Sequence, residues 1–169
     1  MALLQNIDPD GLFEYSVVFT DRSLNHMSQN FQSVMRSLSK KLKQVYRSEG
    51  IALIPGGGTF GMEAIARQFA NDQNVLVVRN GWFSFRWSQI FSKGNITSNV
   101  KVLSASPTFE NFQAPFKPVS LDKIKLYINE NKPSVVFAPH VETSAGIMLP
   151  DEYLKGISNA VPVSYTHLR

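Results

Sequence analysis

The first strong pattern along the chain is a stripe of apolar side chains at helical spacing. Between residues 29 and 47 these side chains recur three and four positions apart, which places them on one face of a helix. Ser28 stands directly before the run and is of the type that caps helices. The spacing predicts an amphipathic helix over 29–47. Its apolar stripe consists of Phe31, Val34, Met35, Leu38, Leu42, Val45 and Tyr46.

Short, mainly apolar runs that are rich in Val, Ile or Leu then alternate with helical patterns. The runs predict strands at 51–54, 75–78, 100–103 and 134–138. The segments between and after them predict helices at 61–70, 83–92, 121–129 and 151–160. Strands without polar positions are covered on both faces, so the pattern predicts an α/β fold, a three-layer sandwich with a mainly parallel sheet. Its crossovers should be right-handed.

Composition narrows the class of protein. With 43% hydrophobic and 18% charged residues, the 169-residue chain fits a soluble globular protein with one core. The net charge of +4 is scattered apart from Lys40, Lys41 and Lys43, which we interpret as a solvated helix face and not as a nucleic-acid patch. The absence of cysteine excludes disulfides and Cys-based sites and is compatible with the cytoplasm. No run reaches the roughly 18 apolar residues of a membrane helix.

In open parallel sheets ligands bind beyond the carboxyl ends of the strands, so the segments that follow strands carry the candidate chemistry. The first of these is Gly56-Gly-Gly-Thr59, between a predicted strand and a predicted helix. Three glycines let the backbone approach a ligand, Thr59 can cap the helix, and the free N–H groups of a helix start suit a phosphate. The loop matches neither the Walker pattern nor the dinucleotide fingerprint.

Two further segments follow strands. Asn80-Gly81 marks a turn before a dense run of aromatics, of which one could stack on a flat heterocycle. On the residues alone, an aromatic cluster that packs in the core is favoured there. The segment 138–146 places His140, Glu142 and two hydroxyls just past a buried strand. Two ligands without a third do not make a zinc site, and Ser144 lacks the hydrolase elbow pattern.

Together, in this order, the three segments resemble the class V aminotransferases of the alanine–glyoxylate and serine–pyruvate type. The matching motifs are Gly56-Gly-Gly-Thr-Phe-Gly-Met-Glu-Ala64, Asn80-Gly-Trp-Phe-Ser-Phe-Arg86 and His140-Val-Glu-Thr-Ser-Ala-Gly146. Asp21-Arg-Ser23 is similar to an N-terminal motif of that family, and the likeness covers residues 20–160. It implies a fold type I enzyme with pyridoxal 5′-phosphate as cofactor.

The resemblance assigns roles to residues of this chain. Gly57, Gly58 and Thr59 are expected to donate to the cofactor phosphate, Phe83 to stack on the pyridine ring, and Thr143 to hydrogen-bond the phenolic oxygen. Supporting roles fall to residues that brace the Thr143 loop or lie near the mouth of the site. These are Glu142, Ser144 and, near the mouth, Arg22.

The family also has an Asp on the ring nitrogen, a Schiff-base Lys and a carboxylate-binding Arg, all later in its sequence than the last residue of this chain. No lysine here aligns with the Schiff-base position, so we expect no catalytic residue, no metal and no transaminase activity from this chain alone. The corresponding domain prediction is an N-terminal segment at 1–27, part of the large cofactor-binding domain at 28–162, and a foreign or disordered tail at 163–169.

The expected function is transamination between a small amino acid, alanine or serine, and a 2-oxo acid, glyoxylate or pyruvate. The full-length protein is expected to be a cytoplasmic homodimer that binds neither nucleic acid nor membrane. Three alternatives remain open: a 2-aminoethylphosphonate–pyruvate aminotransferase, a non-enzymatic phosphate- or nucleotide-binding domain built on the glycine loop, and a fragment without function.

Overall fold

The structure is a computed structural model that describes residues 29–161. The chain divides into two compact units, with the division between Leu53 and Ile54. This division falls inside the range 28–162 that the sequence predicts to be one domain. Each unit is described by itself below.

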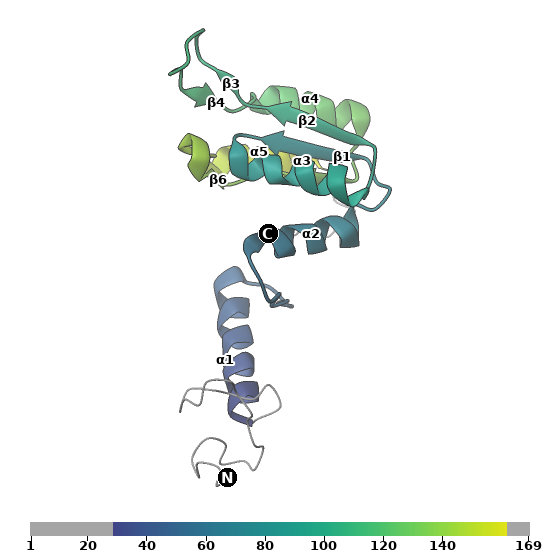
Figure 1. The fold of residues 1–169 in the computed structure, drawn as a ribbon, viewed down its shortest axis with the longest axis vertical. Helices are drawn as coiled ribbons and strands as arrows, with labels where there is room; N and C mark the ends of the chain where they lie inside the picture. The colour runs from purple at the N-terminus through teal and green to yellow at the C-terminus, as the bar shows by residue number, and fades with distance from the viewer. Residues whose placement is uncertain (1–28, 162–169) are drawn as a thin grey trace. The chain divides into compact units, whose positions relative to one another are not determined.

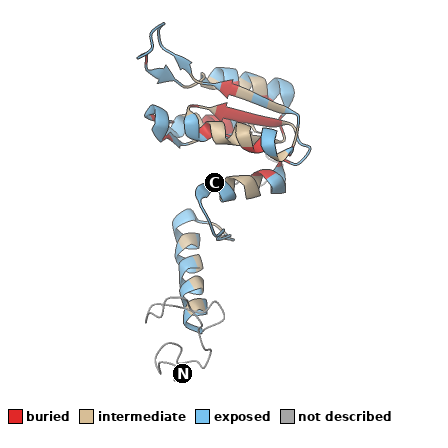
Figure 2. Cartoon of the chain, in the orientation of Figure 1, coloured by how far each residue is buried: buried red, intermediate tan, exposed pale blue. Residues whose placement is uncertain are grey.

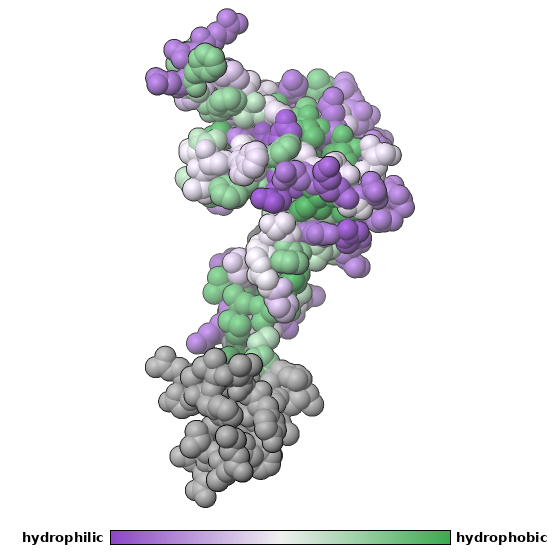
Figure 3. Space-filling view, viewed as in Figure 1, coloured by the Kyte–Doolittle hydropathy of each residue, from purple (hydrophilic) through white to green (hydrophobic). Residues whose placement is uncertain are grey.

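The first unit contributes one long helix, α1 (Gln29–Tyr46), which matches the predicted helix to within one residue at its end. None of its residues is buried by the described part of the chain, and Leu38 and Val45 remain exposed (Figure 2). Part of the apolar stripe is visible as green side chains in Figure 3. Its charged residues are all basic, so α1 has an apolar face and a positively charged polar face. These residues are Arg36, Lys40, Lys41 and Lys43.

The second unit is built on a three-stranded parallel sheet (Figure 1). The strand β1 (Val75–Arg79) lies between β2 (Val100–Ser104) and β5 (Val135–Phe137). Val75 pairs with Val100 on one side and with Val135 on the other. The predicted mixed α/β architecture with a small parallel sheet is therefore confirmed.

Helices cover both faces of this sheet. On one face α2 (Gly58–Phe69) and α3 (Trp82–Gly94) pack on Val75 and Val77. On the other face α4 (Leu121–Asn131) and α5 (Asp151–Ala160) pack on Leu76 and Val78. Because alternate residues of β1 point to opposite faces, a strand covered on both sides has to be apolar throughout. Figure 2 shows β1 as the most continuously buried element.

Two small antiparallel pairs lie outside the main sheet, and the sequence did not predict them. One joins β3 (Ser106–Pro107) to β4 (Phe116–Lys117). The other joins β6 (Val141–Glu142) to β7 (Ile147–Met148), with the 3-10 turn η1 (Thr143–Ala145) between them. Each strand has two residues, which is too short for a pattern of alternating polarity.

One predicted strand is wrong. Residues 51–54 are irregular and join no sheet in the described part of the chain. A strand needs a neighbour for its backbone hydrogen bonds, and this run pairs with neither of the free edges at β2 and β5. The glycine loop therefore does not follow a strand as predicted.

The following helix also differs from its prediction. It begins at Gly58, three residues earlier than the predicted start at 61, and its N-cap is Gly57. The other predicted strands and helices agree with the observed elements to within a few residues at their ends. In residues 29–161 no helix combines the length and the apolarity needed to span a bilayer.

Candidate functional site

The first turn of α3 carries the most organised polar arrangement of the second unit. It begins directly after β1, and the first N–H groups of any helix have no partner within the helix. The carboxylate of Glu142 lies on these groups. One of its oxygens accepts from the Phe83 amide at 3.0 Å, and the other accepts from the Ser84 amide at 2.8 Å. A residue 58 positions away thus caps α3.

Two hydroxyl groups complete this arrangement. The Ser84 Oγ donates to Glu142 at 2.6 Å and accepts from the Asn80 amide at 2.8 Å. The Ser144 Oγ donates to Glu142 at 2.5 Å and accepts from the Trp82 amide at 2.8 Å. Each hydroxyl donates its one proton to the carboxylate and accepts, through its lone pairs, from backbone amides at the start of α3. The β6–β7 turn and the start of α3 are therefore held together as one polar cluster.

The protonation state of Glu142 follows from these contacts. Its side chain is 1% exposed, and burial alone raises the pKa of a carboxyl group. Hydrogen bonds from Ser144, Ser84 and the Phe83 amide oppose this effect, and the net result is a pKa below the ordinary value of 4.5. Glu142 is an anion at neutral pH, and the positive end of the α3 dipole favours that charge.

Gly81 makes the close approach possible. A methyl group at its Cα would lie 2.6 Å from the Ser144 Oγ and 2.8 Å from the Glu142 Cγ. Only a residue without a side chain leaves room for the carboxylate to reach the helix. The Asn80-Gly81 turn predicted from the sequence is thus also the contact point for the 142–144 turn.

The topology places this cluster at the carboxyl ends of β1 and β5. After β1 the chain turns to α3 on one face of the sheet, whereas after β5 it leads to α5 on the other face. Adjacent parallel strands whose connections diverge in this way leave a crevice at their carboxyl ends, and ligands of open α/β sheets bind there. Phe83 lies on α3 and Thr143 on η1, the two segments that the hydrogen bonds of Glu142 and Ser144 join.

Phe83 and Thr143 are both accessible. Phe83 is 56% exposed although it lies in the first turn of a packed helix, and Thr143 is exposed at the start of η1. The alternative of an aromatic cluster that packs in the core does not hold for Trp82 and Phe83, since both are exposed. His140 is exposed as well, and no group of three metal-binding side chains occurs among residues 29–161.

The glycine loop is directed toward the same edge of the sheet. The chain passes from the end of α2 into β1. The ends of α2 and α3 lie close together, because a methyl group added to Gly94, the last residue of α3, would be 3.2 Å from the Arg67 side chain. The two helices therefore run in the same direction, and both begin at the carboxyl edge (Figure 1). Gly57 and Gly58 have open space around them. In the described residues, no hydrogen bond joins this loop to Phe83 or Thr143.

The predicted capping role of Thr59 is wrong, because Gly57 is the N-cap and Thr59 lies in the first helical turn. The amides of Gly58 and Thr59 are among the N–H groups that have no partner within the helix. Gly56 has a φ of +131°, and a methyl group there would lie 2.6 Å from the Phe60 ring. The loop conformation thus requires glycine at 56. Arg22 lies outside the described residues.

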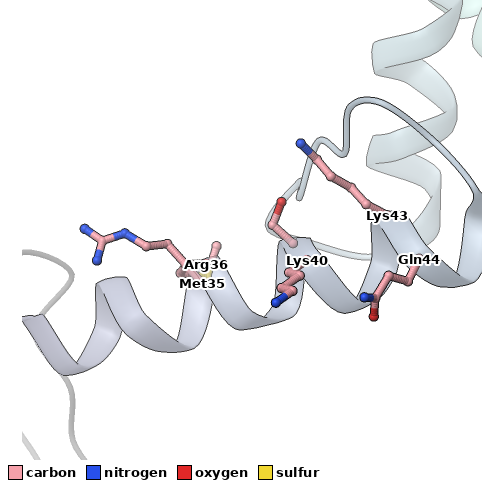
Figure 4. A pocket seen from close by; sticks show the side chains of 6 residues that line it. Met35, Arg36, Lys40, Lys43 and Gln44 are labelled. Atoms are coloured by element: carbon pink, nitrogen blue, oxygen red, sulfur yellow. The ribbon is translucent and has the colours of Figure 1, made fainter.

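A hollow on the described surface belongs to the first unit. It lies on α1, and Figure 4 shows Arg36, Lys40 and Lys43 around it together with Met35 and Gln44. None of the residues predicted for the cofactor site lies there. Its cationic lining agrees with the interpretation of Lys40 and Lys43 as part of a solvated face.

The sequence analysis missed two residues of the polar cluster. Ser84 receives no role from the family motif, although it stands three positions after the N-cap Gly81, where a hydroxyl can reach back to cap a helix. For Gly81 the sequence predicts only a place in a turn. The capping pattern could have indicated Ser84, but the approach of Glu142 to Gly81 depends on tertiary contacts.

No model of a known protein family matches this chain, and no curated protein matches it. The likeness to class V aminotransferases therefore depends on the three sequence motifs alone.

Proposed function

We propose that this chain is part of the cofactor-binding domain of a class V, fold type I aminotransferase and that it binds pyridoxal 5′-phosphate. The observation that carries the proposal is the Glu142 cluster. It ties the turn that bears Thr143 to the helix start that bears Phe83, at the carboxyl edge of the sheet. These are the two segments to which the resemblance assigns the ring of the cofactor.

The residues present fit such a ligand. An exposed aromatic face at Phe83 offers a stacking surface for a flat ring. The exposed Thr143 hydroxyl can donate to an oxygen on that ring. The amides of Gly58 and Thr59, at a helix start with open space around the glycines, suit a phosphate. Glu142, Ser84 and Ser144 hold the ring-binding segments in place and do not touch the ligand.

When bound, the cofactor supplies an electron sink that makes removal of a proton from an amino acid feasible. The residues of this chain bind the cofactor, orient its ring and keep it at the edge of the sheet. None of its lysines is assigned a proton-transfer role. The substrates proposed are a small amino acid, alanine or serine, and a 2-oxo acid such as glyoxylate or pyruvate, in a full-length homodimer of the cytoplasm.

The test uses pyridoxine 5′-phosphate, which has the ring, the phosphate and the phenolic oxygen but lacks the aldehyde that would react with surface lysines. Calorimetric titration of the full chain should detect binding. Phe83→Ala and Thr143→Val should each weaken it by about tenfold, the effect of losing about 1.4 kcal/mol of interaction. Leu126→Ala changes an exposed apolar residue on α4 and serves as the control. Absence of binding to the wild-type chain would contradict the proposal.

A phosphate-binding domain without aminotransferase function is the second candidate. It is favoured by the lack of any hydrogen bond between the glycine loop and the Phe83 and Thr143 segments in residues 29–161. In that case inorganic phosphate and a nucleotide should bind as well as pyridoxine 5′-phosphate, and Phe83→Ala should have no effect. Under the first proposal, the ring adds affinity beyond that of phosphate.

A further inference from the structure

A second group of side chains at the same end of the sheet lies outside the proposed cofactor site. Arg79 is the last residue of β1, and its guanidinium carbon lies 5.3 Å from the centre of the Phe85 ring. The Phe85 ring lies 5.6 Å from that of Trp82, which is 62% exposed. Arg79, Phe85 and Trp82 together form an arginine–aromatic cluster on the first turns of α3.

The guanidinium of Arg79 lacks the partner that such a group normally has. Arg79 is half-buried, and within the part of the chain that the structure describes its side chain has neither a salt bridge nor a hydrogen bond. The one salt bridge there joins Arg67 to Glu63 on α2. A guanidinium has five N–H donors in a planar fork that matches a carboxylate. Within residues 29–161, none of these donors has a partner.

The cluster is also pre-organised. Side chains two positions apart on a strand point to the same face. Arg79 therefore lies on the face of Val75 and Val77, toward α3. The aromatic ring beneath the guanidinium attracts its charge and restricts its orientation. Binding a ligand then costs less side-chain entropy than it would at a mobile arginine.

This cluster is separate from the Phe83 side of α3. Phe83 and Phe85 are two positions apart on a helix, which directs their side chains to opposite flanks. The ring that contacts Arg79 is that of Phe85, and Phe83 makes no contact with Arg79 or Trp82 in the described residues. A ligand on Arg79 therefore uses a different surface.

We infer that the arginine–aromatic cluster is a binding site for a small aromatic carboxylate. The carboxylate pairs with the Arg79 fork, and the flat ring of the ligand lies on the exposed indole of Trp82. A ligand of about ten heavy atoms with one charge-assisted pair binds in the millimolar range. The inference does not depend on the proposed function.

Fluorescence titration of the full chain with benzoate tests the site. The chain has two tryptophans, and Trp87 packs on Phe137 at 4.2 Å, so a Trp87→Phe background isolates the signal of Trp82. Benzoate should change the Trp82 emission with saturation at millimolar concentration. Benzamide, which has the same ring without the charge, should bind at least tenfold more weakly.

Variants decide whether Arg79 carries the binding. Arg79→Gln should weaken benzoate binding at least tenfold, and Arg79→Lys should weaken it less, since it keeps the charge but loses the fork. Arg67→Gln is the matched control and should have no effect, because Arg67 lies on α2 and is already paired with Glu63. Circular dichroism establishes that each variant is folded, and Arg79→Lys serves if Arg79→Gln does not fold.

Three results would overturn the inference. They are no response of the wild-type chain to benzoate, equal binding of benzoate and benzamide, and benzoate affinity of a folded Arg79→Lys or Arg79→Gln variant equal to that of the parent. Each is independent of whether pyridoxine 5′-phosphate binds.

Discussion

At the scale of single residues, Glu142 connects the stability of the second unit to pH. Its carboxylate accepts from two amides and two hydroxyls at the start of α3. A carboxyl group whose pKa is lowered by folding stabilises the fold above its unfolded pKa. That contribution is lost as the pH falls through the lower folded value. Acid should therefore loosen the polar cluster before it affects the apolar core.

We predict that Glu142→Gln reduces the free energy of unfolding at neutral pH by about 1–3 kcal/mol, the usual effect of losing hydrogen bonds to a charged group. The loss should shrink as the pH falls below the ordinary carboxyl value of 4.5, because the wild-type protein loses the same contribution there. Urea unfolding of both proteins between neutral and acidic pH measures it. A difference that stays constant across this range would contradict the account.

Gly81 gives a second prediction at this scale. Gly81→Ala should lower the midpoint of thermal unfolding, because the added methyl group meets the Ser144 Oγ at 2.6 Å and the buried Glu142 side chain. The matched control is Gly61→Ala in α2, where nothing lies within 4 Å of the added group. That control should stabilise the protein by up to about 1 kcal/mol through helix propensity. Equal effects at the two positions would exclude the close approach at Gly81.

At the scale of elements, Tyr153 joins α5 to the segment that leads into α4. Its hydroxyl donates to the Val119 carbonyl at 2.5 Å, and burial raises its pKa to about 12. A group whose pKa is raised by folding contributes stability below its unfolded pKa and loses that contribution as the pH rises through the folded value. The window for Tyr153 therefore lies between the ordinary value of 10.0 and about 12.

We predict that Tyr153→Phe costs about 1 kcal/mol of stability at neutral pH through the lost hydrogen bond. The wild-type protein should lose its advantage over the variant as the pH rises from 10.0 toward 12. Denaturant unfolding of the two proteins at neutral and alkaline pH provides the measurement. The hydrogen bond to Val119 would be ruled out if the variant were as stable as the wild type at neutral pH.

The sequence predicted most elements because their patterns are local. The fully apolar β1 and the striped α1 follow from periodicity alone. The run at 51–54 has the same apolar pattern as β1, but whether such a run becomes a strand depends on whether the tertiary fold brings it to a sheet edge, which periodicity does not show. The two-residue strands β6 and β7 exist because the 142–144 turn docks on α3. Likewise, whether Arg79 has an ion-pair partner depends on which carboxylates lie nearby in space, and the local sequence does not show this.

At the scale of the whole molecule, the two units differ in how much apolar surface they bury. The second unit has two clusters of buried residues, one on each face of β1. In α1, none of the residues is buried by the described part of the chain. An amphipathic helix without a covered face opens readily, since isolated helices of this length are marginal in water.

This contrast predicts the pattern of hydrogen exchange. The amides of Leu76, Val77 and Val78 should exchange slowest, near the free energy of global unfolding. Those of α1 should exchange faster by several orders of magnitude through local opening. Exchange followed by mass spectrometry on the full chain tests this. Protection in α1 equal to that in β1 would mean that its apolar stripe is covered in solution.

The central claim is that the glycine loop, Phe83 and Thr143 hold one ligand. The most direct measurement is the change in backbone amide NMR shifts during titration with pyridoxine 5′-phosphate. We predict that the amides of Gly58, Thr59, Phe83 and Thr143 shift together with one dissociation constant, while those of α1 do not. Shifts confined to Gly58 and Thr59, or different dissociation constants for the three segments, would contradict the claim.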